Sequence, residues 1–386
     1  MKYLELETFA EFRCVGSDCA FSCCEGGWEI RIDPESYSYY KTVPGEFGDR
    51  LRRSIKEQKG NKYFVLTEDG RCSFLNKDNL CDIYINLGEE HLCHTCKTYP
   101  RYHFTAGDIK FSGVTIACPV VAKYILEHEE PLRMYFSVDE KESSEISEAD
   151  RKVSDHAIDA LSTAVGILQD REYSISERLA ILTVFMAQFQ AYVDGQKEPS
   201  GLIELFADHS NLKEILPQTG VYDRSFDSKA AFYSASFSYL GAIRQFELIF
   251  PELCELMGFF VHDGQMSISV DELSDTYTVL DGKEVQLWAE QLLTYAMQRY
   301  FLQGCLKRDF FNCYLLGTLL FYGISISTIA LYHLRWKRLP DFTELVMIIV
   351  HTSRILEHDI PVRDGAIEHF KNNRMTDPAF LLKLFS

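Results

Sequence analysis

Residues 72–96 read CSFLNKDNLCDIYINLGEEHLCHTC, and this stretch shows that the first third of the chain is rich in cysteine. Its four cysteines are separated by short apolar runs and by the turn-forming residues 76–79. Upstream lies a second group, Cys14-x4-Cys19-x3-Cys23-Cys24, and a Cys-Pro pair at residues 118–119 closes the pattern. Nine of the 12 cysteines therefore fall within the first 118 residues: Cys14, Cys19, Cys23, Cys24, Cys72, Cys81, Cys93, Cys96 and Cys118. We expect them on loops and short elements whose geometry is fixed by what the thiols bind.

The composition narrows the class of protein. The chain has 386 residues, 46% of them hydrophobic, which is enough to bury a substantial core. Its net charge of −18 disfavours non-specific nucleic-acid binding, which needs clustered Lys and Arg. The segment 1–7, MKYLELE, has neither the apolar run nor the small-residue cleavage site of a secretory signal. We therefore expect a cytoplasmic protein whose thiols are reduced, so that the cysteines bind metal or act chemically instead of pairing as disulfides.

Thiolates are the soft ligands that select zinc or iron–sulfur clusters, and either centre takes four of them. Nine thiols supply one such centre with several left over, or two centres with one to spare. The spacing does not choose between zinc and iron, because only Cys93-x2-Cys96 has the spacing of a zinc ribbon. His91, His94 and His103 lie beside the second group and are interpreted as loop residues that do not bind the metal. The remaining three cysteines, Cys254, Cys305 and Cys313, lie in apolar helical stretches and are expected in the core.

The pattern predicts a mainly α protein with a small cysteine-rich α+β region of short strands followed by a large all-helical domain. The expected division is a metal-binding domain over 1–126, an acidic linker over 127–146 and a helical domain over 147–386. Ser147 is expected to cap the first long helix and Ser176 the second, which ends before Asp194-Gly195. Strands are predicted near 28–33, 63–66 and 266–270, and helices near 34–40, 177–193, 228–250, 283–303, 310–334 and 341–357.

The segment 310–334 carries no Asp, Glu, Lys or Arg and is long enough to cross a bilayer. It contains polar residues and two glycines, and a turn near Gly323-Ile324-Ser325 would divide it into two shorter helices. We therefore expect two buried helices and no membrane span. No dinucleotide-binding, phosphate-loop, zinc-protease or serine-hydrolase motif is present in the sequence.

Several of these motifs together resemble the flagellin lysine N-methylase family, and the first of them resemble a broader group of proteins thought to chelate zinc or iron. The resemblance lies in residues 12–33, in Cys72-Ser73-Phe74-Leu75, in 80–84, in 92–101 and in Ala117-Cys118-Pro119. It implies methyl transfer from S-adenosylmethionine to lysine ε-amines of a protein substrate, flagellin or one like it. It also implies a [4Fe-4S] cluster on the N-terminal cysteines.

The sequence identifies neither the catalytic base nor the residues that bind S-adenosylmethionine. Asp82, Tyr84 and Tyr99 lie near the cysteines only in sequence. Two other functions stay open on the residues alone. One is a zinc-stapled module that binds a protein partner without catalysis, and the other is a thiol-based redox or metal sensor, which requires exposed cysteines of low pKa.

Overall fold

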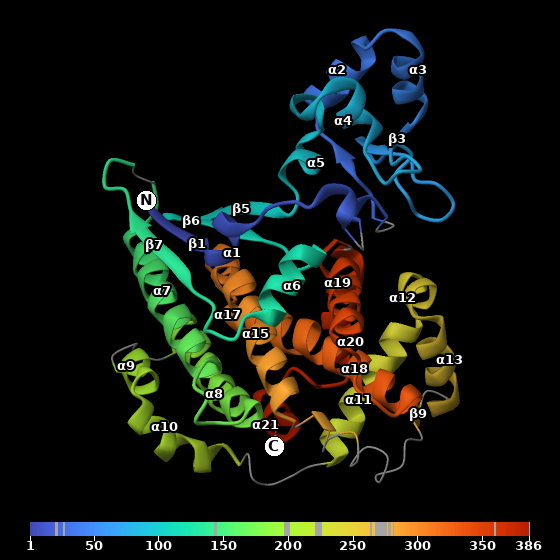
Figure 1. Cartoon of the computed structure of the whole chain (residues 1–386). Helices are drawn as coiled ribbons and strands as arrows, with labels where there is room; N and C mark the ends of the chain where they lie inside the picture. The colour runs from blue at the N-terminus through green and yellow to red at the C-terminus, as the bar shows by residue number, and fades with distance from the viewer. Residues whose placement is uncertain are drawn as a thin grey trace.

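The computed structural model describes residues 1–19, 22–25, 28–142, 145–196, 201–220, 226–262, 265–266, 276, 279–280, 282–358 and 360–385. These residues form a small lobe of short helices and strands, which stands on a large helical body (Figure 1). The predicted fold class, a mainly α protein with a small cysteine-rich α+β region before a large helical part, is confirmed.

A four-stranded sheet joins the start of the chain to the helical body. Its strand order is β5-β6-β1-β7, with β1 parallel to β6 and antiparallel to β7. The strands are β1 (Lys2–Leu6), β5 (Arg101–Ala106), β6 (Ile109–Val114) and β7 (Met134–Val138). Leu4, Leu6 and Phe111 of this sheet belong to the same hydrophobic core as the helices of the body. The segment predicted to be an acidic linker thus contains a strand, β7, which pairs with the first strand of the chain.

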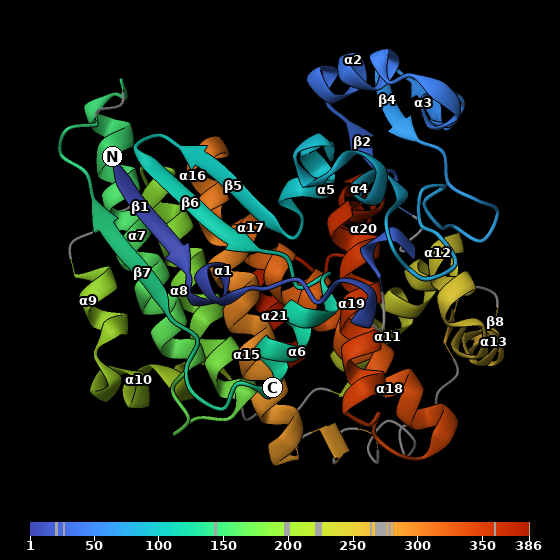
Figure 2. The same cartoon turned by 45° about the horizontal axis from the view of Figure 1, so that its top comes forward.

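The lobe is an excursion of the chain between β1 and β5, and it has a hydrophobic core of its own. Ile32, Tyr40, Phe64 and Phe74 are buried in that core. The lobe contains a three-stranded sheet of order β2-β4-β3 with helices around it (Figure 2). Its elements are β2 (Arg31–Ile32), α2 (Pro34–Thr42), α3 (Gly45–Arg53), β3 (Ile55–Gln58), β4 (Asn61–Phe64), α4 (Asp82–Leu87) and α5 (His94–Thr98). The short helix α1 (Glu7–Glu11) lies outside the lobe and packs against β6 and α6 of the body. The strand predicted over 28–33 is therefore limited to two residues, whereas the helix predicted from residue 34 is present.

The helical body is built around α15 (Lys283–Tyr300), which is buried on nearly every side and contacts α6, α7 and the 316–323 segment. A helix surrounded in this way is the usual centre of a large helical core. The other principal helices are α6 (Pro119–Glu127), α7 (Glu148–Leu168), α8 (Ile175–Val193), α11 (Phe226–Gly241), α12 (Arg244–Ile249), α13 (Pro251–Phe260), α19 (Phe342–His358), α20 (Ile360–Asn372) and α21 (Pro378–Phe385). The helix predicted over 228–250 is thus two helices, divided at residues 242–243. The strand predicted near 266–270 includes only Gln265–Met266 as β9, and the rest of it lies outside the described residues.

Side-chain caps define the starts of the first two long helices. The hydroxyl of Ser147 accepts a hydrogen bond from Asp150 N, as predicted for α7. The prediction for α8 was wrong by two residues, because Ser174 is the cap and forms a reciprocal capping box with Glu177. The sequence offers a serine at 174 and another at 176, but only the first has a glutamate three residues later.

The apolar segment after residue 310 is one continuous helical stretch, so the predicted turn near Gly323 was wrong. It consists of α17 (Phe310–Leu315), a π-helix (Leu316–Gly323) and α18 (Ile324–Trp336). Gly323 is instead a packing site, because a Cβ there would lie 2.5 Å from Phe232 Cζ. Among the described residues, this stretch is long and apolar enough to cross a membrane. However, 83% of its most apolar 18 residues are buried inside the protein.

A buried carboxylate connects α8 to α15. Glu290 is 2% exposed, and its oxygens accept hydrogen bonds at 2.8 Å from Arg178 and from Arg171. Arg178 is also buried and donates to the carbonyl oxygens of Leu168 and Tyr173. Removing one partner of such a pair leaves a buried charge without compensation.

We therefore expect Glu290→Leu to lower the free energy of unfolding by about 3–5 kcal/mol in urea denaturation. The double variant Glu290→Leu, Arg178→Met serves as the control, since it removes both buried charges and should recover much of the loss. A double variant as unstable as the single one would show that packing, and not the stranded charge of Arg178, sets the cost.

Candidate active site

The cysteines of the lobe lie at the junctions of short elements, as the sequence predicts. Cys81, Cys93 and Cys118 each immediately precede a helix, and Cys23 and Cys24 lie in a single 3₁₀ turn. The amide of Cys72 donates to the carbonyl oxygen of Cys24 at 2.7 Å, which connects the two cysteine groups.

The structure brings most of the nine thiols toward one region. Cys24, Cys72, Cys81, Cys93 and Cys96 belong to or pack against the core of the lobe. The thiols of Cys23 and Cys24 are hydrogen-bonded to each other, as are those of Cys93 and Cys96. The other three lie further out: Cys118 is in the core of the body, Cys19 is half-buried and close enough to affect the pKa of the Cys118 thiol, and Cys14 is exposed.

Burial and mutual proximity keep most of these thiols protonated in the absence of a metal. The Cys24 hydrogen bond and burial hold the pKa of Cys23 well above its usual range. Burial raises the pKa of Cys72 and of Cys118 to about 11 each. The exception is Cys93, where the hydrogen bond from Cys96 lowers the pKa. A bound cation reverses such shifts because it stabilises the thiolate form.

The donor set fits a soft metal centre in its chemistry, since it is almost entirely sulfur. Among the residues that the structure describes, however, no three His, Cys, Asp or Glu side chains form a group able to hold a metal ion as they stand. The histidines named from the sequence make other contacts. His91 stacks on Tyr39, and His103 Nδ1 lies 2.8 Å from the hydroxyl of Ser112. His94 is exposed, and its backbone amide donates to Asp33.

A polar seam, which we define as the contact of Trp28, Tyr99 and Arg101–Cys118 with α15 and α19, joins the lobe and the sheet to the body. The indole of Trp28 stacks on the imidazole of His358, the last residue of α19, with ring centroids 4.8 Å apart. Tyr99 packs against both rings, at 5.4 Å from Trp28 and 5.9 Å from His358. Trp28 is fixed in turn by a 2.8 Å hydrogen bond from Nε1 to the carbonyl oxygen of Cys23.

Glu357 lies at the centre of the seam with its side chain 2% exposed. It accepts hydrogen bonds from Thr115 at 2.9 Å and from Tyr295 at 3.4 Å, and it faces the guanidinium of Arg299 at 3.4 Å. Burial raises the pKa of this carboxyl, and Arg299 opposes the rise. Arg299 also covers the ring of Tyr102 at 3.3 Å.

The histidines on this part of α19 are held neutral. Burial, and then the charge of Arg354, lower the pKa of both His351 and His358 to about 4. Arg354 is itself buried and donates to the carbonyl oxygen of Ala117 at 3.2 Å. The seam is therefore an environment in which an additional cation is disfavoured.

Sequence reasoning did not find this seam. In the sequence, Tyr99 is a neighbour of the cysteines, Trp28 belongs to a predicted strand and to a motif of the family resemblance, and nothing singles out His358. The sequence offers one signal on α19: three ionisable residues, Arg354, Glu357 and His358, fall within one turn and a half at the end of a helix whose middle, residues 345–350, is apolar.

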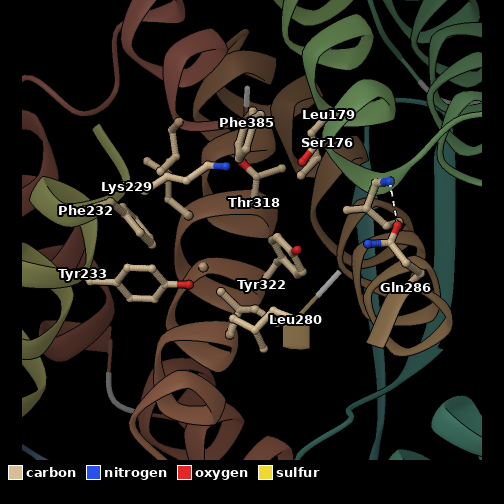
Figure 3. Close-up of a pocket in the computed structure, with 15 residues that line it drawn as sticks. Ser176, Leu179, Lys229, Phe232, Tyr233, Leu280, Gln286, Thr318, Tyr322 and Phe385 are labelled. Atoms are coloured by element: carbon tan, nitrogen blue, oxygen red, sulfur yellow. Dashed lines mark hydrogen bonds between the residues drawn. The ribbon is translucent and has the colours of Figure 1, made fainter. Parts of the chain in front are cut away.

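A separate cavity lies within the body, between α8, α11, α21 and the π-helix (Figure 3). Figure 3 shows its polar groups: Gln286, whose Oε1 accepts from the amide of Ile175 at 2.9 Å, together with Tyr233, Tyr322 and Lys229. Its volume is about 90 Å³, below the ~300–1,000 Å³ of ordinary small-molecule pockets. The cavity in this form holds a few water molecules and not a nucleoside-sized donor.

A family model and similar curated proteins point to the same family. The chain matches the FliB lysine N-methylase C-terminal domain over residues 162–384, which is more than half of its length. It is 29% identical over 133 residues to the flagellar biosynthetic protein FliU of Salmonella muenchen, a span of 32% of this chain and 76% of that protein. It is also 29% identical over 133 residues to the lysine-N-methylases of Salmonella typhimurium and Salmonella choleraesuis. The matched region covers 32% of each of those two proteins. No solved structure matches the chain.

The two neutral histidines predict a loss of stability in mild acid. In the unfolded chain a histidine takes up a proton near its ordinary pKa of about 6.5, whereas in the folded protein His351 and His358 do so only near pH 4. The unfolded state therefore binds more protons between these values, so the free energy of unfolding should fall as the pH is lowered from 6.5 to 4. Urea denaturation at a series of pH values measures this slope.

His358→Phe should flatten the slope, and the exposed His94→Phe is the matched control. A slope that is unchanged in His358→Phe would contradict a buried, neutral histidine at the seam.

Proposed function

Since the chain belongs to the FliB lysine N-methylase family, we propose that it is a protein-lysine N-methyltransferase that uses S-adenosylmethionine, acts on a flagellin-type protein and holds a [4Fe-4S] cluster on its N-terminal cysteines. The observation that carries the proposal is the family match itself, because it covers most of the helical body. Two of the relatives are named lysine-N-methylases, and a third is named a flagellar biosynthetic protein.

The reaction makes a clear demand on the protein. The lone pair of a neutral lysine ε-amine forms a bond to the methyl carbon, and the carbon–sulfur bond of the donor breaks with its electron pair going to sulfur. The products are S-adenosylhomocysteine and a methylated ammonium group, which then loses a proton. Lysine is protonated in water at neutral pH. The protein must therefore lower the pKa of the amine before transfer, either by taking it out of water or by placing it near other cations.

The seam meets this demand in its electrostatics. Arg354 is buried there and Arg299 is half-buried, the histidines are neutral, and the Glu357 carboxylate is already engaged by hydrogen bonds. An amine brought into this environment is favoured in its neutral, nucleophilic form.

The cluster is proposed from the donor set. A four-iron cluster takes four thiolates, and Cys24, Cys72, Cys81, Cys93 and Cys96 share one core. A cluster held by only three of these thiolates would leave one iron free to act as a Lewis acid toward the amino and carboxylate groups of the donor. The raised pKa of Cys23, Cys72 and Cys81 argues against the thiol-sensor alternative, which needs low-pKa, exposed cysteines. Zinc bound to the same thiols is the remaining alternative.

The protein is proposed to work in the cytoplasm, where reduced thiols persist and newly made flagellin-type subunits are accessible. Its acidic character, with a net charge of −18, suits a lysine-bearing protein substrate better than nucleic acid. The single long apolar helical stretch among the described residues is mostly inside the body, so the proposal includes no membrane span.

Metal and sulfide analysis of anoxically purified protein tests the cluster. We expect iron and acid-labile sulfide in equal amounts, with the brown colour of a cluster. Cys93→Ser should abolish both, while Cys313→Ser, at a buried cysteine of the body, should keep them. A colourless protein with stoichiometric zinc and no iron would refute the cluster and favour the zinc-stapled module.

A transfer assay tests the activity. The protein, S-adenosylmethionine carrying a labelled methyl group and purified flagellin should yield label on lysine, detected by mass spectrometry of proteolytic fragments. Flagellin with its surface lysines acetylated is the control and should take up no label, because acetylation removes the nucleophilic lone pair. Absence of transfer to any lysine-bearing protein by the iron-loaded enzyme would overturn the proposed function.

A further inference from the structure

We propose that the polar seam is the binding site for the substrate's primary amine, with Tyr99 Oη and His358 Nε2 accepting hydrogen bonds from its two N–H groups. The inference rests on the proposed function and deepens it, because it assigns the part of the molecule that receives the lysine side chain. It starts from two buried polar atoms that have no hydrogen-bond partner in the part of the chain that the structure describes.

Tyr99 Oη and His358 Nε2 are both buried, and neither has a hydrogen-bond partner among the residues that the structure describes. A buried polar atom without a partner destabilises the folded state and is uncommon in native structures. Here two of them lie on rings whose centroids are 5.9 Å apart, one from the lobe and one from the end of α19. Such a pair at the junction of two separate cores is where a ligand is expected.

The donor and acceptor count matches a neutral primary amine. A phenol oxygen can accept a hydrogen bond, and so can Nε2 of a neutral imidazole whose proton is on Nδ1. A neutral primary amine has two N–H donors and one lone pair. If both donors are taken by Tyr99 and His358, the lone pair remains for the methyl carbon.

The charges around these two atoms select the same form of the ligand. Arg354 on α19 and Arg299 on α15 are the cations of the seam, and Glu357 is occupied by Thr115, Tyr295 and Arg299. Both arginines oppose a second cation next to His358. A lysine side chain that enters is therefore expected to bind as the neutral amine.

The aromatic rings fit the rest of the ligand. Trp28, stacked on His358 and against Tyr99, offers an apolar face to the methylene chain. The same face can contact the methyl group once it has been added to the nitrogen.

The site can be tested with n-butylamine, which is the lysine side chain without its backbone. Tyr99→Phe and His358→Phe keep the stacked rings and remove the two acceptors. Because each removes an unpartnered buried polar atom, neither should lower the melting temperature. Loss of one hydrogen bond worth about 1 kcal/mol should weaken n-butylamine binding by about five-fold, measured by calorimetry on the anoxically purified protein.

Tyr84→Phe, at an exposed tyrosine of the lobe, and His333→Phe, at a histidine on α18 whose Nδ1 is also buried without a partner, are the matched controls and should bind as the wild type does. Wild-type protein that binds no n-butylamine, or controls that weaken binding as much as the seam variants, would overturn the site.

The methyl-transfer assay separates this inference from the proposed function. A wild type that binds n-butylamine through Tyr99 and His358 but transfers no methyl group would refute the activity and leave the amine site standing. A wild type that methylates flagellin, with unchanged kcat and KM in both seam variants, would refute the amine site and leave the activity standing.

Discussion

Glu357 occupies the point where three otherwise separate parts of the molecule meet. Its carboxylate accepts hydrogen bonds from Thr115, at the end of the sheet, and from Tyr295 and Arg299 of the central helix α15. The hydroxyl oxygen of Tyr295 in turn accepts a hydrogen bond from the backbone amide of Ile116 at 3.0 Å. These contacts hold the end of the sheet against α15 and α19 within one hydrophobic core, whereas the lobe, which has a core of its own, meets the body through the packing of Trp28 and Tyr99 against His358. Polar contacts of this kind fix the orientation of the packed elements as well as their separation, because a hydrogen bond weakens when its angle departs from linear.

The sequence predicts the parts of this fold that depend on local patterns. The cap at Ser147 and the cysteines at the junctions of short elements follow from residues a few positions apart. The errors arise where tertiary packing overrides the local signal. Gly323 looks like a break in a helix, but its missing side chain makes room for Phe232, so the helix continues as a π-helix.

The seam shows why a functional site can escape sequence reasoning. Trp28 lies shortly before β2, Tyr99 follows the last residue of α5 and His358 ends α19, and no spacing rule connects these three positions. Each alone has an ordinary structural explanation. Only the fold shows that two of their polar atoms are buried without a partner among the described residues, and that burial, with the charges of Arg354 and Arg299, lowers the pKa of His358. The thiols behave in the opposite way, because their number alone indicates a site before any contact is known.

The insertion of the lobe between β1 and β5 has a consequence for how the chain acquires its structure. Strand β1 is made first, but its partners β6 and β7 begin only at Ile109 and Met134. Until those residues leave the ribosome, β1 has no sheet to join, whereas the lobe between has its own core and can fold in the meantime. Folding of the lobe shortens the loop that β1 must close, which lowers the entropic cost of a pairing across a long stretch of chain. Early folding of the lobe would therefore help the N-terminal strand to pair in the sheet once β6 and β7 have been made.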